Sequence, residues 1–209
     1  MNSAHEKVLV VPRALLDGIG SFQGLCFNTD SYLRAFFVRE NNRFMPRRDV
    51  EDNTAFKQLI PYAFLVWDNK VLHYERGSTG GEARLVKKGS IGIGGHINQS
   101  DENVLALDQS GYSQIVLREL REELIIDDEI ENRVVALLND DSNDVGKVHL
   151  GIVHRIRLRA GRVRPGETDV VNPQFLAPPE LLSRRASLES WSQICLDNLK
   201  MLLETKGIL

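Results

Sequence analysis

Cysteine is scarce in this 209-residue sequence, and its two copies, Cys26 and Cys195, lie far apart and outside any CxxC pattern. Such usage disfavours a small secreted domain held together by disulfides and fits the reducing cytosol. The chain also lacks an uninterrupted apolar run of membrane-spanning length, and no basic stretch followed by an apolar core is found near residue 1. We therefore expect a cytoplasmic protein with no membrane partner.

A strong excess of one charge is absent as well. The formal net charge is −3 and the pI is near 6.0, so there is no electrostatic case for binding a nucleic-acid polymer. A small anionic ligand stays possible, because a local cation or a bound metal outweighs a weak overall charge. The 42% of hydrophobic and 26% of charged residues are typical of a globular protein. The length suits one domain with room for an appended lobe.

The clearest local signal is a β-hairpin. Two strand-like runs, Pro61–Trp67 and Lys70–Arg76, flank Asp68-Asn69, a pair suited to a two-residue turn. Strands and helices alternate elsewhere without βαβ regularity, which favours an α+β fold or a layered α/β/α sandwich. The other elements that we expect are strands at Lys7–Pro12, Arg133–Leu138 and Val148–Leu158, and helices at Ser31–Arg39, Gln114–Ile126, from Pro178 onward and at Leu188–Leu203.

The expected helix at Gln114–Ile126 carries two different faces. At 100° per residue, Leu117, Leu120 and Leu124 form one apolar stripe with Val116 at its edge. Three acids converge on another face, because they stand at positions i, i+3 and i+4: Glu119, Glu122 and Glu123. A hard divalent cation with oxygen ligands would stabilise this crowded negative charge. The alternative is a solvated helix face that Arg118 and Arg121 neutralise.

The sequence around this helix favours the divalent-cation site over a solvated helix face. Gly94-Gly95-His96-Ile97 follows the hairpin, and Arg118-Glu119-Leu120-Arg121-Glu122-Glu123 matches the R-E-U-x-E-E part of a known signature, where U is aliphatic. On these residues the chain resembles the Nudix (MutT-type) hydrolase family from about residue 61 to residue 180. The resemblance implies a Nudix-like α/β/α sandwich with a mixed sheet. It divides the chain into an N-terminal extension, residues 1–55, packed on the core or at a dimer interface, and a catalytic domain with a C-terminal helix, residues 56–209.

Two departures from the family pattern stand out. Arg118 comes 23 positions after Gly95 where the pattern requires 14, so the loop carries nine extra residues. Asp101 or Glu102 is then the candidate for the first box glutamate. In addition, Ile125 occupies the place of a glycine that usually permits a left-handed helix end, so we expect the helix to continue or to end differently.

The resemblance also implies roles for residues of the site. It makes the box carboxylates and a glycine carbonyl the ligands of Mg²⁺, with Mn²⁺ as a substitute, whereas Arg118 orients the glutamates. Glu167 is the first candidate for the general base and Glu119 the second, although Glu167 fits an exposed turn acid equally well. The expected metal ligands are Glu119, Glu122, Glu123 and Gly94. The candidates for contacting substrate phosphate are Arg76, Lys87 and His96, with solvated surface charge or a structural hydrogen bond as their alternatives.

The function implied is that of a pyrophosphohydrolase that cleaves a phosphoanhydride bond in a small nucleoside-diphosphate-type substrate. One alternative is a catalytically inactive Nudix-fold module that binds a nucleotide or regulates another protein. Another is an isomerase of the isopentenyl diphosphate type, which is disfavoured because neither Cys26 nor Cys195 lies in the corresponding region. Apolar surface on the N-terminal lobe and on the Leu188–Leu203 helix leads us to expect a homodimer.

Overall fold

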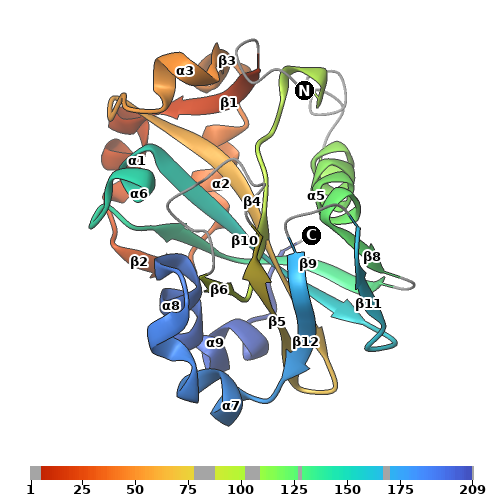
Figure 1. Cartoon of the computed structure of the whole chain (residues 1–209). Coiled ribbons are helices and arrows are strands. Elements are labelled where there is room, and N and C mark those ends of the chain that lie inside the picture. The colour runs from red at the N-terminus through yellow and green to blue at the C-terminus, as the bar shows by residue number, and fades with distance from the viewer. Residues whose placement is uncertain (1–5, 78–87, 102–108, 127–128, 167–169, 209) are drawn as a thin grey trace.

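A mixed β-sheet forms the centre of the molecule in the computed structural model, which describes residues 6–77, 88–101, 109–126, 129–166 and 170–208 (Figure 1). Its two long central strands, β4 (Phe56–Trp67) and β10 (His149–Leu158), pair in parallel. Across the sheet the order is β12-β5-β4-β10-β9-β2, and the other neighbours in this order are antiparallel. The remaining strands are β1 (Lys7–Pro12), β2 (Gly24–Cys26), β3 (Arg43–Pro46), β5 (Lys70–Arg76), β6 (Gly89–Ser90), β7 (Ile93–Gly94), β8 (Leu124–Ile126), β9 (Glu129–Asn139), β11 (Val163–Pro165) and β12 (Val170–Leu176).

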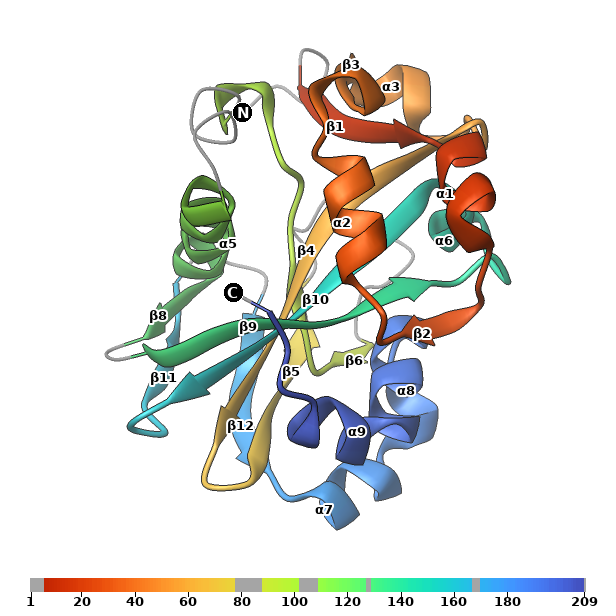
Figure 2. The same cartoon turned by 180° about the vertical axis from the view of Figure 1, so that it is seen from behind.

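Helices cover both faces of this sheet. Helices α1, α2 and α5 pack on one face around Leu59, Leu65 and Ile152, whereas α7, α8 and α9 pack on the other around Tyr62 and Phe64. Figures 1 and 2 show α5 apart from α8 and α9, with the strands between them. The α/β/α sandwich with a mixed sheet is therefore confirmed. The helices are α1 (Arg13–Gly20), α2 (Asp30–Phe36), α3 (Arg47–Val50), α5 (Gln109–Glu123), α6 (Asp144–Val148), α7 (Pro178–Ser183), α8 (Ser190–Asp197) and α9 (Leu199–Glu204), with 3₁₀ turns at Arg39–Asn41, Gln99–Asp101 and Arg185–Ser187.

The predicted hairpin joins β4 to β5. Its turn residues, Asp68 and Asn69, both have positive φ angles of 47° and 57°. This is the left-handed conformation that a two-residue type I′ turn requires and that Asp and Asn adopt at low cost. The turn sets the register Val66↔Val71 and Trp67↔Lys70. The hairpin prediction is confirmed.

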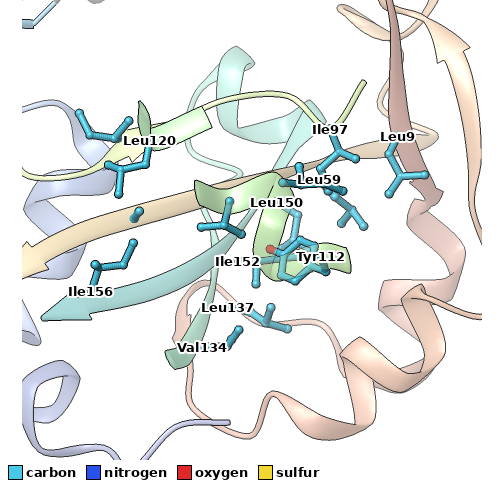
Figure 3. Packing of buried hydrophobic residues seen from close by; sticks show 14 of the residues in the cluster. Leu9, Leu59, Ile97, Tyr112, Leu120, Val134, Leu137, Leu150, Ile152 and Ile156 are labelled. Atoms are coloured by element: carbon cyan, nitrogen blue, oxygen red, sulfur yellow. The ribbon is translucent and has the colours of Figure 1, made fainter. Parts of the chain in front are cut away.

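The N-terminal segment contributes to the central sheet. Strand β1 pairs antiparallel with β4 and β3, and β2 pairs with β9. Leu9 of β1 is fully buried beside Leu59 and Ile97 in the core (Figure 3). Strands β1 and β2 thus join the N-terminal segment to the central sheet.

The acidic helix departs from the prediction at its end. We expected it to reach Ile126, but α5 ends at Glu123 and Leu124–Ile126 forms β8, which pairs with β11. Strand pairing overrides the helical pattern here, because β-branched Ile125 and Ile126 suit a strand. The buried side chains of α5 also differ from the expected stripe, since Leu117 is partly exposed. Those buried are Tyr112, Ile115, Val116 and Leu120.

The expected single helix at Leu188–Leu203 is two short helices, α8 and α9, so that prediction was wrong. The chain breaks at Asn198, whose φ and ψ are −115° and 17°. The Asn198 amide side chain donates to the Ile194 carbonyl at 2.9 Å, and such competition with backbone bonding disfavours a continuous helix. The bend keeps Leu196, Leu199 and Leu202 buried.

None of the helices in the described part of the chain is both long enough and apolar enough to cross a membrane.

Candidate active site

Arg118 is the centre of the charged face of α5. Its guanidinium lies 2.7 Å from the Glu119 carboxylate, 2.9 Å from that of Glu122 and 2.8 Å from that of Asp101. These pairs differ in exposure, because the Glu122 side chain is 56% exposed and that of Glu119 only 14%. Arg118 therefore pairs with two acids of α5 and with Asp101.

The buried member of this group, Glu119, lies against the glycine corner. Gly95 donates its N–H to the Pro61 carbonyl at 3.4 Å, and a Cβ atom on Gly95 would overlap the Glu119 carboxylate. The position thus requires glycine for close approach rather than for its φ angle. Burial raises the pKa of Glu119 to about 7, although the nearby Arg118 opposes the shift.

Asp101, one of the two candidates for the first box acid, lies beside Arg118. It is 5% exposed, accepts the Asn98 N–H at 2.8 Å and pairs with Arg118. Of the two candidates, Asp101 is therefore brought to the site. Glu102 lies outside the described residues, as does most of the extra loop.

The structure tests the expected gathering of three carboxylates. Among the described residues, no group of three or more His, Cys, Asp or Glu side chains lies close enough together to hold a metal ion. Glu119 and Glu122 pair with Arg118 instead, which corresponds in part to the alternative of a neutralised helix face. The donor types still fit Mg²⁺, because this ion commonly takes only one or two protein carboxylates and completes its shell with water and phosphate oxygens. The exposed Glu122 side chain can turn toward an ion at little cost.

Two predicted site residues, Lys87 and Glu167, lie outside the described residues. The residue before Glu167 is placed, however. Gly166 donates its N–H to the Glu123 carbonyl at 2.9 Å, so Gly166 lies at the end of α5.

A cavity of about 430 Å³ lies on the other side of the glycine corner. Gly94, Gly95 and His96 form one wall of it. Ile60 and Tyr62 line it from the sheet face that α7 to α9 cover, opposite the face on which α5 packs. Its size lies within the range of about 300–1,000 Å³ that is usual for small-molecule sites.

Arg76, a predicted phosphate contact, lines this cavity and is held by a buried acid. Its Nε donates to Glu189 at 3.1 Å. Glu189 as a whole is only 4% exposed. Its other carboxylate oxygen lies 2.6 Å from the Ser90 hydroxyl and 3.2 Å from that of Ser192. The Tyr62 hydroxyl lies 3.3 Å from the same oxygen. Because the acid is bonded on both oxygens, Arg76 has a fixed orientation.

His96, the other described phosphate candidate, lines the cavity as a neutral ring. Its Nε2 lies 3.0 Å from the Gln58 side-chain oxygen, and burial together with nearby Arg47 keeps its pKa well below 6.5. His149 stacks edge-on against it, with 5.5 Å between ring centroids, and also lines the cavity. His154 is buried elsewhere, between Tyr112 and Asn132. His149 and His154 therefore lie in separate surroundings.

Several residues of the cavity were not identified from the sequence, among them Arg47, Glu189 and Trp191. Arg47 belongs to α3, whereas Glu189 and Trp191 lie at the start of α8. None belongs to a motif, and nothing in the local sequence marks them.

Comparisons with known proteins agree with this geometry. No model of a known protein family matches the sequence. Protein YmaB of Bacillus subtilis is 36% identical over 214 residues, which cover 96% of this chain and all of that protein. The crystal structure of Tm1382, described there as a candidate Nudix hydrolase, has a TM-score of 0.72 and 25% identity and covers 93% of this chain and 98% of that one. The NUDIX domain of Shewanella oneidensis NrtR, crystallised with ADP-ribose, has a similar fold, with a TM-score of 0.51, 16% identity and coverage of 70% and 88%.

Proposed function

This chain belongs to the Nudix hydrolase family, and from that premise we propose that it is a metal-dependent pyrophosphohydrolase that cleaves a phosphoanhydride bond in a small nucleoside-diphosphate-type substrate. One observation carries the proposal. A buried carboxylate, Glu119, lies against Gly95, and the box arginine holds it there together with Glu122 and Asp101.

Glu122 and Glu123 would hold the ion, with Glu119 as a further ligand and the Gly94 carbonyl completing the set. Mg²⁺ is the metal that we propose, with Mn²⁺ as a substitute. When bound, it supplies neutralisation of the diphosphate oxygens. Arg118 keeps the acids oriented, and Arg76 binds a phosphate oxygen of the substrate. Glu167 is our first choice for the group that takes the proton from water, and Glu119 is the second.

A panel assay tests the function. We incubate the protein with Mg²⁺ and with nucleotide sugars, dinucleoside polyphosphates, ADP-ribose or nucleoside triphosphates, and follow the release of phosphate or nucleotide. We expect turnover of at least one compound, its loss in EDTA, and a decrease of about a hundredfold or more in Glu122→Gln and Glu123→Gln. Glu204→Gln, an exposed glutamate of α9, is the matched control and retains activity.

The same assay separates the alternatives. Binding without turnover of any compound would favour the inactive nucleotide-binding module. Full activity in both Glu122→Gln and Glu123→Gln would exclude the mechanism. An isomerase stays disfavoured, since Cys195 is fully buried among the C-terminal helices and neither cysteine lines the cavity.

The expected homodimer stays a proposal. Exposed apolar side chains on α7 and α9, Leu182 at 55% and Met201 at 52%, support it, since such groups suit an interface. A monomeric mass by light scattering at micromolar concentration would contradict it.

A further inference from the structure

The cavity beside the glycine corner is built largely by segments that carry no part of the box. Arg47 comes from α3 in the N-terminal segment, and Trp191 comes from α8 near the C-terminus. Gly95 separates this cavity from Glu119, because it lines the cavity and also contacts the carboxylate. A ligand in the cavity therefore lies next to the glycine corner that contacts Glu119, although α5 itself contributes no residue to the described lining.

Arg47 is held in a fixed position by two acids. Its Nη1 donates to Glu6 at 3.0 Å and its Nε donates to Glu51 at 3.3 Å. No residue in the described part of the chain hydrogen-bonds to its Nη2. The two bonds therefore fix the guanidinium plane through Nε and Nη1, and Nη2 is the nitrogen that can donate to a ligand. A preorganised guanidinium loses less entropy when it binds a carboxylate or phosphate group.

The cavity also has an aromatic part. Tyr62 and Trp191 meet edge to face, with 5.4 Å between their ring centroids, and the Tyr62 hydroxyl is fixed 2.9 Å from that of Ser192. Trp191 remains partly exposed, so a flat ring can pack against it. His96 adds a neutral ring whose Nδ1 accepts a hydrogen bond, because its Nε2 donates to Gln58.

We propose that the cavity binds the nucleoside monophosphate portion of the substrate, with the base against Trp191 and with Arg47 as a phosphate-binding residue supplied by the N-terminal segment. The chemistry of the walls carries this assignment: one side offers an aromatic ring, and Arg47, Arg76 and Lys88 offer cationic groups. This inference takes from the proposed function only that the ligand is a nucleotide. The position of the ligand and the residues that bind it are inferred from the cavity itself.

Tryptophan fluorescence tests the position of the ligand. The chain has two tryptophans, and Trp67 packs on Phe175 away from the cavity. In EDTA, AMP should change the fluorescence of Trp67→Phe, where Trp191 is the sole tryptophan, and should leave that of Trp191→Phe unchanged. No change in Trp67→Phe at about 10 mM AMP, which would nearly saturate a site with a Kd of about 1 mM, would overturn the assignment.

A pair of neighbouring arginines tests the role of Arg47. Arg48 is 70% exposed, pairs only with Asp49 among the described residues and does not line the cavity. In the Trp67→Phe background, Arg47→Met should weaken AMP binding about tenfold, as expected for the loss of a charged hydrogen bond, whereas Arg48→Met should not change it. Arg47→Lys should fall between the two. Adenosine should bind about tenfold more weakly than AMP and should not respond to Arg47→Met.

The outcomes separate folding and function from recognition. Circular dichroism and thermal unfolding establish that Arg47→Met is folded, since Arg47 also pairs with Glu6 and Glu51. Equal AMP affinity of Arg47→Met and Arg48→Met would overturn the role of Arg47. If Glu122→Gln keeps full activity while AMP binding still depends on Arg47, the proposed function fails and this inference stands. If Glu122→Gln loses activity but AMP binding does not depend on Arg47, the proposed function stands and this inference fails.

Discussion

The two sides of Gly95 differ in how their polar groups are assembled. On the α5 side, Arg118, Glu119 and Glu122 lie within about one helical turn, and only Asp101 comes from another element. On the cavity side, the groups come from segments far apart in the chain. They are Arg47, Arg76, His96, Glu189 and Trp191.

This difference shows that a sequence motif identifies only those residues of a site that lie close together in the chain. Helical spacing brings i, i+3 and i+4 residues together by local geometry, so the chemical side is visible as a short pattern. The cavity side depends on α3, β4 and α8 reaching their final places. The two sides should therefore also respond differently to substitution, and the three variants below test this, from the largest expected effect on stability to the smallest.

Glu189→Ala should have the largest effect, and it belongs to the cavity side. The change leaves Arg76 and the hydroxyls of Ser90 and Ser192 without their acceptor. Removing one partner of such a buried group should lower the free energy of unfolding by about 3 kcal/mol. Urea denaturation measures the loss. Asp197→Ala, which breaks an ion pair exposed at the surface, should change stability far less. An equal loss in the two variants would contradict the stabilising role of the buried Glu189 carboxylate.

Gly95→Ala should act on both sides at once. The added methyl group would overlap the Glu119 carboxylate, so the corner or the acid has to move. Overpacking of this kind costs about 1–3 kcal/mol of stability, and we also expect loss of phosphoanhydride hydrolysis in the panel assay. Gly18→Ala is the control, because a Cβ there meets no atom within 4 Å. Full stability and activity in Gly95→Ala would show that the close approach at the corner is dispensable.

The smallest expected effect is the change in stability between pH 7 and 5.5 that His154, a residue packed against Tyr112 of α5, contributes. Burial lowers the pKa of His154 from 6.5 to about 3. Below pH 6.5 the unfolded chain binds a proton at this residue and the folded protein does not, so stability is full above pH 6.5 and falls as the pH decreases toward 3. The slope is at most about 1.4 kcal/mol per pH unit.

His154→Gln removes this contribution while keeping a polar side chain near Tyr112 and Asn132. Between pH 7 and 5.5 the variant should lose less stability on acidification than the unsubstituted protein, as measured by urea denaturation at each pH. Identical slopes would mean that His154 does not stay neutral in the fold. AMP binding by the cavity should not change in this variant.

The sequence by itself determined the hairpin at Asp68-Asn69, the strand Lys7–Pro12 and the acidic box, because each depends on turn chemistry, a continuous apolar run or helical spacing within a few residues. These were sufficient for the family and the sandwich fold. Tertiary structure decided that α5 ends at Glu123, since β11 offers β8 a strand partner. It also brought Asp101 to Arg118, and Arg47 and Trp191 to one cavity. These contacts depend on which separate segments meet in space, and helical or strand spacing within one segment does not specify them.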